Sequence, residues 1–202
     1  MARYTGPKHR LARKEGVNIL EKHSPSLERR LNVPPGQLGS KRPRRKPSDY
    51  SRQLREKQKA KRTYGLLEKQ FRRYYHLSSQ KKGKTSEALM RLLECRLDNV
   101  VYRLGFSKSR SQARQFVNHD HVLVNEKKVN IPSYQVRQDD IITLDKDILD
   151  TPDLHKLLED ALYKPPAWLE RKAAVGKVSH LPSPEELETN FNLQLIIEFY
   201  SR

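Results

Sequence analysis

The clearest hydrophobic pattern lies in the middle of the chain. From Leu89 to Leu104 leucines and valines recur every three or four residues over several turns, and Gly105 stands where a helix C-cap is expected. This pattern predicts one continuous amphipathic helix. A shorter helix should follow, with Ser109 as its N-cap and Asn118 at its end.

The shorter helix separates apolar from basic side chains. Its apolar residues, Ala113, Phe116 and Val117, should face inward, whereas Arg110 and Arg114 fall together on the outward face. Two more cations lie near the junction of the two helices. We expect a rigid basic surface here, a feature that suits recognition of a folded RNA. This surface consists of Arg103, Lys108, Arg110 and Arg114.

Alternating apolar positions after these helices predict a small sheet. Residues 121–125 and 127–131 have the pattern of two strands joined at Asn125–Glu126, and further strand material lies around Tyr134, Val136 and residues 141–144. Helices followed by a sheet indicate an α+β fold. The pattern therefore predicts a compact module made of two helices packed on a short mixed or antiparallel sheet.

Helical patterns also flank this module. Ser48 is a suitable N-cap for a helix that runs to Gly65, and a second helix is predicted around Leu67, Phe71 and Tyr74. Tyr74, Tyr75 and His76 could stack on bases, although aromatic residues at helical spacing more often belong to a core. Thr151 and Pro152 open another predicted helix, Trp168 should anchor the segment after it, and residues 191–200 fit either a helix or a strand.

Residues 1–47 show neither helical nor strand periodicity. They contain six prolines and four glycines, and should be extended because they cannot bury enough apolar surface to offset their ordering entropy. Their densest basic run, residues 41–46, could be a solvated tail, a localisation signal or a nucleic-acid contact. The sequence KKGKT at Lys81–Thr85 lacks the earlier glycine and the preceding strand of a phosphate-binding loop, so we interpret it as a basic linker.

Charge is distributed very unevenly. The chain has 41 Lys and Arg against 24 Asp and Glu, a net charge of +17. Residues 1–85 hold 25 basic and 6 acidic residues, a balance of +19, whereas residues 86–202 hold 16 and 18, a balance of −2. Because the excess lies in one part of the chain, that part should bind a polyanion. The acidic third from residue 145 onward is better suited to a protein neighbour.

Other features exclude several classes. Cys95 is the only cysteine, which excludes an internal disulfide and any multi-cysteine metal site. No apolar stretch is long enough for a bilayer span, and the N-terminus lacks the apolar core of a secretory signal, so we expect a soluble intracellular protein. The Arg96–Leu97–Asp98 sequence resembles that of a pseudouridine synthase, but an Asp paired with a nearby Arg explains it better. His119 and His121 lack a third metal ligand, and Cys95 should be packed.

Several motifs, taken together, carry a resemblance to a known family. Residues 96–136 (RLDNVVYRLGFSKSRSQARQFVNHDHVLVNEKKVNIPSYQV) resemble the S-four RNA-binding module. The segments MARYTGP, PPGQLG, PSDYSRQLREKQKAKRTYG and IIEFYSR resemble the family of small-subunit ribosomal protein four, in the right order and over nearly the whole chain. Pseudouridine synthases and tyrosyl-tRNA synthetases also carry the module, but attached to catalytic domains that are not evident here.

The resemblance implies a structural role without catalysis or a cofactor. It implies binding of small-subunit ribosomal RNA early in assembly, contact with neighbouring proteins five and possibly three, a position beside the channel through which messenger RNA enters, a contribution to accuracy, and a cytoplasmic or organellar ribosome. The alternative is a free RNA-binding or RNA-modifying protein. Many family members hold a zinc through four cysteines, but this chain has Lys8–Ala12 where the first pair would stand, so no metal is expected. Asp120, Glu126 and Asp139 replace turn glycines, and the Asn125–Glu126 turn should therefore differ in type.

These observations together predict an organisation and a binding surface. The expected parts are an extended arm over residues 1–47, a basic helical domain over 48–90 completed by residues 180–202, and the S-four module with its acidic helix over 91–179. The side chains expected to contact RNA are Arg3, Lys8, Arg10, Arg13, Lys41, Arg42, Arg44, Arg45, Lys46, Tyr50, Arg52, Arg55, Lys59, Arg62, Arg72, Arg73, Arg103, Lys108, Arg110, Arg114, His119 and His121.

Overall fold

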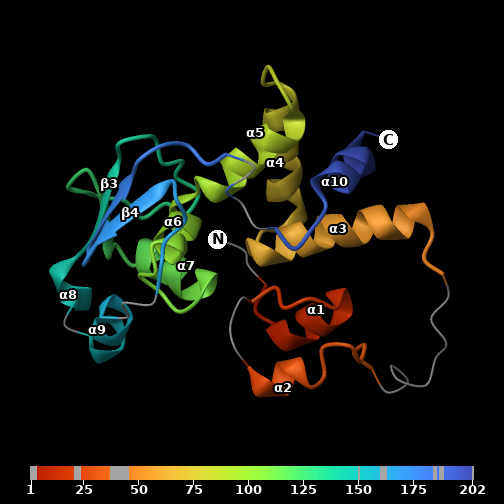
Figure 1. Ribbon diagram of the computed structural model, residues 1–202, viewed down its shortest axis with the longest axis horizontal. Helices are drawn as coiled ribbons and strands as arrows, with labels where there is room; N and C mark the ends of the chain where they lie inside the picture. Colours follow the sequence, from red (N-terminus) through yellow and green to blue (C-terminus); the bar gives the residue numbers. More distant parts are fainter. Residues whose placement is uncertain are drawn as a thin grey trace. The chain divides into compact units, whose positions relative to one another are not determined.

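The computed structural model describes residues 4–20, 24–36, 46–149, 151–159, 163–183, 186 and 189–201. It divides into two compact units. The first consists of Met1–Ser86 together with Thr189–Arg202, and the second consists of Glu87–Glu188. Helices make up the first unit and a helix-covered sheet the second (Figure 1), so the predicted α+β class is confirmed.

The first unit is built on a helix whose start and end the sequence predicted. Its described helices are α1 (Lys8–Glu15), α2 (Pro25–Glu28), α3 (Asp49–Thr63), α4 (Glu68–Ser79) and α10 (Leu193–Tyr200). The Ser48 hydroxyl caps α3 by accepting a hydrogen bond from the Ser51 amide at 3.3 Å. At the other end Gly65 adopts a φ of 63°, which a glycine reaches without steric cost.

The last helix, α10, packs against α3 although the two are far apart in the sequence (Figure 1). Tyr200 stacks on Tyr75 and on Phe71, with ring centroids 4.7 and 6.2 Å apart. Tyr75 is therefore part of the packing rather than a platform for bases. Phe71 and Ile196 are fully buried in the same region.

The N-terminal segment differs from its prediction. Residues 8–15 form helix α1, and Ala12, Ile19 and Leu27 are buried together in a small apolar cluster. Side chains of α1 and α3 also meet, because Arg62 forms an ion pair with Glu15 and Arg55 donates to the Lys14 carbonyl. The expectation of an extended arm is thus wrong for this part. Apolar burial here comes from contacts among Ala12, Ile19 and Leu27, whose spacing follows neither a helical nor a strand period.

The second unit packs helices α6 and α7 against an antiparallel sheet. The strand order is β2-β1-β3-β5-β4 among the described residues. Its described helices are α5 (Thr85–Glu94, whose first two residues belong to the first unit), α6 (Leu97–Arg103), α7 (Arg110–Asn118), α8 (Lys146–Leu149) and α9 (Pro152–Leu158). Its strands are β1 (Val122–Val124), β2 (Lys127–Lys128), β3 (Ile141–Leu144), β4 (Leu169–Lys172) and β5 (Val175–Val178).

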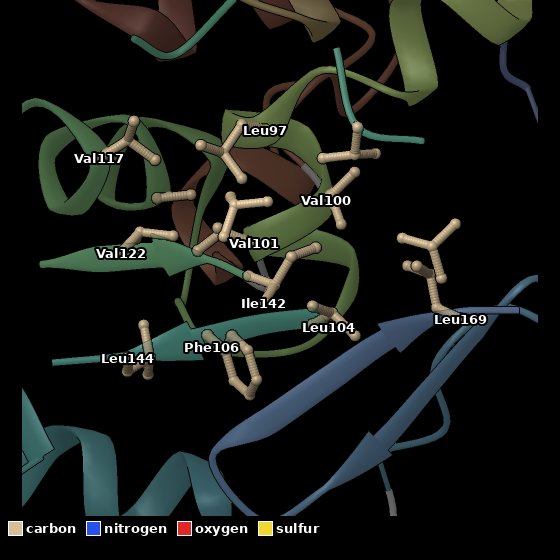
Figure 2. Close-up of a cluster of buried hydrophobic side chains, with 14 of the residues drawn as sticks. Leu97, Val100, Val101, Leu104, Phe106, Val117, Val122, Ile142, Leu144 and Leu169 are labelled. Atoms are coloured by element: carbon tan, nitrogen blue, oxygen red, sulfur yellow. The ribbon is translucent and has the colours of Figure 1, made fainter. Parts of the chain in front are cut away.

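The core of this unit lies between α6, α7 and the sheet. Figure 2 shows Leu97, Val101 and Val117 of these helices directed toward Val122 and Ile142 of the strands. All five side chains are fully buried. Trp168, which the sequence predicted as an anchor, is also fully buried in this core, and Cys95 is packed there as expected.

One predicted feature of this unit needs correction, and one predicted turn takes an unfavourable geometry. The helix expected from Leu89 to Leu104 is broken, because Cys95 and Arg96 leave helical geometry and bond to the segment around Gln135. The Asn125–Glu126 turn keeps positive φ at both residues, 50° and 66°, despite its glutamate. This is the geometry of a two-residue hairpin turn that favours glycine at the second position, so Glu126 adopts the positive φ that its side chain disfavours.

Candidate nucleic-acid interface

Whether a cation can bind RNA depends on whether the protein already neutralises it. A paired and buried guanidinium must give up its partner before it can reach a phosphate, whereas an exposed one without a carboxylate partner need not. The predicted cations of the two units can be separated by this criterion.

The cations of α3 are largely engaged within the first unit. Arg52 lies 3.7 Å from the Asp49 carboxylate, Lys59 Nζ lies 2.6 Å from Glu56, and Arg62 pairs with Glu15. Arg55 remains exposed, but its Nη1 donates to the Lys14 carbonyl at 2.7 Å. The four cations of this helix that the sequence analysis expected to contact RNA are therefore already bound by acids or a carbonyl of the protein.

The predicted basic surface of the second unit is also internally bonded. Glu94 is fully buried and accepts from Arg103 Nε at 3.2 Å and Nη2 at 3.1 Å, and from Asn99 Nδ2 at 2.7 Å. The other amide atom of Asn99, Oδ1, accepts from Arg110 Nε at 2.8 Å. The Arg110 guanidinium also lies 4.6 Å from the centroid of the Tyr102 ring. This network locks α5, α6 and α7 together.

Arg114 does not face outward as predicted. It is only 7% exposed, and its guanidinium lies 3.7 Å from the Asp98 carboxylate, which Arg96 also binds at 2.7 Å. Asp98 thus has the nearby arginine that the sequence suggested, but in the interior rather than at the surface. Helical spacing placed Arg110 and Arg114 together correctly, but it could not show that a buried acid lies beneath them. Lys108 is the exposed cation of this predicted set.

Helix α4 carries a different kind of surface. Lys69, Arg72, Arg73 and His76 are exposed, and they line a hollow together with Leu77, Gln80 and Glu68. Among the residues that the structure describes, none of these cations has a carboxylate partner. We call this surface, Lys69, Arg72, Arg73, His76, Leu77 and Gln80, the α4 stripe.

Glu68, an acid that borders the α4 stripe, is bound by other residues of the first unit. Glu68 accepts hydrogen bonds from Lys57 Nζ at 2.7 Å, Lys61 Nζ at 3.2 Å and the Tyr200 hydroxyl at 2.7 Å. Burial alone would raise the pKa of Glu68, but the bonds from Lys57, Tyr200 and Lys61 lower it below its ordinary value. Three donors outside the stripe therefore already bind this carboxylate.

The remaining predicted residues are scattered. Lys8, Arg10 and Lys46 are exposed, whereas Arg13 donates to the carbonyls of Val33 and Pro34. Tyr50 is exposed and packs on the Phe199 ring, and the rings of His119 and His121 stack on each other. The predicted residues that lie outside the described part of the chain are Arg3, Lys41, Arg42, Arg44 and Arg45.

Sequence reasoning found only part of the α4 stripe. It counted Arg72 and Arg73 among the RNA contacts and named His76 only as a possible stacking residue, whereas Lys69 was not counted among the contacts and Gln80 was missed. The signal was present, because these residues recur at helical spacing on the face opposite Phe71 and Ser78. Tyr75 and His76 were instead considered together as stacking residues, although adjacent residues on a helix point in different directions.

Other chemistry has little support in the described residues. They hold no group of three His, Cys, Asp or Glu residues that could bind a metal ion, and no helix long and apolar enough to cross a membrane. The features that remain are the basic excess of residues 1–85, which suits a polyanion, and the α4 stripe, whose cations have no carboxylate partner among the described residues.

Comparison with known proteins agrees with this chemistry. Residues 3–94 match the ribosomal protein S4/S9 N-terminal domain, and residues 95–142 match the S4 domain. The chain is 48% identical over 209 residues to small ribosomal subunit protein uS4A of Symbiobacterium thermophilum. It is 50% identical over 212 residues to uS4 of Heliobacterium modesticaldum and 49% over 210 residues to uS4 of Dictyoglomus turgidum. In each case 100% of both chains is covered.

Proposed function

The chain belongs to the uS4 family of small ribosomal subunit proteins, and from that premise we propose that it binds small-subunit ribosomal RNA through its exposed cations, most of which lie in the basic half. It is a structural constituent of the small subunit and not an enzyme. The observation that carries the RNA proposal is the α4 stripe, whose cations face solvent without a carboxylate partner in the described part of the chain. Such charge gains most from phosphate, because binding releases the counterions of the RNA.

The predicted cations divide into two roles under this proposal. Arg72, Arg73, Lys108 and the exposed cations of α1 contact phosphate directly. Arg103, Arg110 and Arg114 hold the helices of the second unit in place, and any contact that they make with RNA is added to that internal role.

Binding of isolated protein to structured ribosomal RNA tests this proposal. If about 6 to 10 phosphates are contacted, affinity should fall by roughly 10³ to 10⁵ between about 50 and 200 mM salt. A nearly flat salt response would contradict phosphate binding. Stoichiometric sedimentation of the protein with small subunits separates a structural role from that of a free RNA-binding protein, which would be recovered mostly outside them.

A role beside messenger RNA and in translational accuracy forms the finer part of the proposal. It is supported by the density of basic residues over 41–46. Replacing Lys41, Arg42, Arg44 and Arg45 by Ala should leave the melting temperature unchanged while impairing translation by subunits that contain the variant. A large loss of thermal stability would show instead that this run supports the fold.

Contact with protein neighbours in the subunit, five and possibly three, is the other finer part, together with early assembly in a cytoplasmic ribosome. The outer face of the sheet supports a protein contact. Ile141 and Val175 on the adjacent strands β3 and β5 are 45% and 43% exposed. Crosslinking from these two positions in assembled subunits should recover ribosomal proteins. Recovery of RNA alone would contradict a protein contact at this face.

A further inference from the structure

We propose that the α4 stripe binds one unpaired nucleotide of the ribosomal RNA, with its base against Leu77 and the adjoining phosphates on the cations. This inference rests on the proposed function and adds the form of RNA that this surface takes. It concerns residues of the first unit only.

The buried side of helix α4 determines which of its residues face solvent and form the α4 stripe. Phe71 and Ser78 are fully buried, and Tyr75 stacks on Tyr200, so one side of α4 is fixed against its own unit. Lys69, Arg73 and Gln80 lie at helical spacing on the opposite side. From residue 69 to residue 80 the helix rises about 16 Å, enough for a stretch of RNA backbone rather than a single ion.

The cations of the stripe are not balanced by the protein. Glu68, the acid that borders the hollow, is occupied by Lys57, Lys61 and Tyr200. Lys69, Arg72 and Arg73 therefore repel one another until an anion arrives. A phosphate backbone removes this repulsion, because guanidinium groups bind phosphate oxygens through paired N–H···O hydrogen bonds.

Leu77 distinguishes an unpaired nucleotide from a duplex. It lies among the cations and is 40% exposed, so the hollow has an apolar part at its surface. A duplex presents phosphates and ribose to a flat helix face and keeps its bases stacked inside. An unpaired nucleotide can turn its base outward, place one face on Leu77 and offer its edge to polar groups. The Gln80 amide and the His76 imidazole are the polar groups that line the hollow nearby.

Two substitutions should give different signatures in binding assays with isolated full-length protein and structured ribosomal RNA. Arg73→Ala should weaken binding and reduce the slope of log affinity against log salt by about one, because one phosphate contact is lost. Leu77→Ala should weaken binding by about fivefold with the salt slope unchanged, because its contact is apolar. The matched controls are Lys156→Ala and Ile131→Ala, which remove an exposed cation and an exposed apolar side chain from the other unit.

The pairing of the bound nucleotide needs a second measurement. A photo-crosslinking residue at position 77, in protein assembled into subunits, should react with a nucleotide that single-strand-specific reagents modify in the free RNA. A crosslink to a paired nucleotide, or no crosslink to RNA, would overturn the inference. So would a Leu77→Ala variant that binds like Ile131→Ala, or an Arg73→Ala variant with an unchanged salt slope.

Failure of the inference is distinguishable from failure of the proposed function. Wild-type protein that binds RNA and sediments with small subunits keeps the function even if the position-77 results are negative. Because these side chains face solvent, thermal melts of all four variants should match the wild type, and a variant that melts earlier would show that its residue supports the fold instead.

Discussion

At the scale of single residues, the Asn125–Glu126 turn shows how a side chain can hold a backbone against its own preference. Asn125 Nδ2 donates to Asp140 at 2.8 Å, and Asn125 Oδ1 accepts from the Ile141 amide at 2.9 Å. These bonds fix the turn although Glu126, with a φ of 66°, has a Cβ that disfavours this region. The sequence showed the unfavourable glutamate but not the bonds that overcome it.

Replacing Glu126 by Gly should therefore stabilise the second unit. We expect the free energy of unfolding to rise by about 1 kcal/mol, the order of strain that a non-glycine residue stores in the left-handed region. Urea unfolding followed by the fluorescence of the buried Trp168 measures it. Lys127→Gly, in the adjoining strand, is the control and should destabilise. A loss of stability in Glu126→Gly would show that the glutamate side chain contributes more than its backbone costs.

Arg171 is a residue whose role sequence patterns did not reveal. Its Nη2 donates to the carbonyls of Leu157 and Leu158 at 3.0 and 2.8 Å, and its Nη1 to that of Leu104 at 3.3 Å. It thus satisfies carbonyls at the ends of α9 and α6, which have no partner within their own helices. Only a three-dimensional arrangement brings the ends of α9 and α6 to one side chain.

Arg171→Lys should lose most of this effect despite keeping the charge. A lysine ammonium cannot reach both groups of carbonyls at once, so we expect a loss of about 2 kcal/mol in unfolding free energy. The exposed neighbour Lys172, changed to Ala, should stay within about 0.5 kcal/mol of the wild type. Equal stability of Arg171→Lys and wild type would mean that charge alone suffices. Trp168 fluorescence during urea unfolding reports both.

At the scale of secondary-structure elements, caps and periodicity predicted the helices that are locally specified. Ser48 and Ser109 cap α3 and α7 as expected, with serine hydroxyls accepting amide bonds at 3.3 Å. Periodicity did not predict the break at Arg96, where the backbone bonds to the distant Gln135 segment. Helices α5 and α6 on either side of the break both bury an apolar face, so their pattern looks continuous in the sequence. Strands β4 and β5 were missed because each has only four residues, and β5 joins the sheet by pairing with β3, which lies far from it in the sequence.

The N-terminal helices α1 and α2 give a further prediction at this scale. Leu27 is 1% exposed in the cluster with Ala12 and Ile19, so apolar packing supplies the order there. Leu27→Ala should cost about 2 to 3 kcal/mol locally. It should raise hydrogen exchange over residues 8–20 and 24–34 without changing the unfolding of the second unit, which Trp168 fluorescence reports. Val33→Ala, 38% exposed, is the control and should leave exchange unchanged.

Removal of metal should not reproduce the effect of Leu27→Ala. The sequence has one cysteine and no clustered histidines that complete a tetrahedral zinc site. We therefore expect a chelator to leave exchange over residues 8–20 and 24–34 unchanged and elemental analysis to find no stoichiometric zinc. Zinc that disappears on substitution of His9, or of His119 and His121, would contradict this.

At the scale of the whole molecule, charge and chain order give different information. The basic excess of the first 85 residues predicted a polyanion, and family membership agrees with that class. Which cations remain available could not be read from the sequence, because pairing with Glu15, Glu94 and Asp98 depends on the fold. The first unit also contains the C-terminal segment from Thr189 onward, which follows the second unit in the sequence. Local sequence patterns therefore do not show which unit this segment stabilises.

The stability of the first unit should depend on pH through Glu68, which the C-terminal helix α10 contacts through Tyr200. Hydrogen bonds from Lys57, Tyr200 and Lys61 outweigh burial and hold the pKa of this carboxyl below its ordinary value of 4.5. A lowered pKa in the folded state contributes stability that is present above the unfolded pKa and lost as pH falls through the folded one. The bond from Tyr200 links α10 to this effect.

Glu68→Gln should therefore lower the melting temperature of the first unit near neutral pH and flatten its decline in acid. The loss arises because Lys57, 4% exposed, keeps a buried charge without its carboxylate partner. As pH falls below the ordinary pKa of 4.5 and this carboxyl protonates, the wild type should lose stability more steeply than the variant, since only the wild type has this group to protonate. Far-UV circular dichroism follows both units, while Trp168 fluorescence follows the second, which should respond identically in both proteins. Parallel pH curves for the two proteins would mean that Glu68 does not control acid unfolding of the first unit.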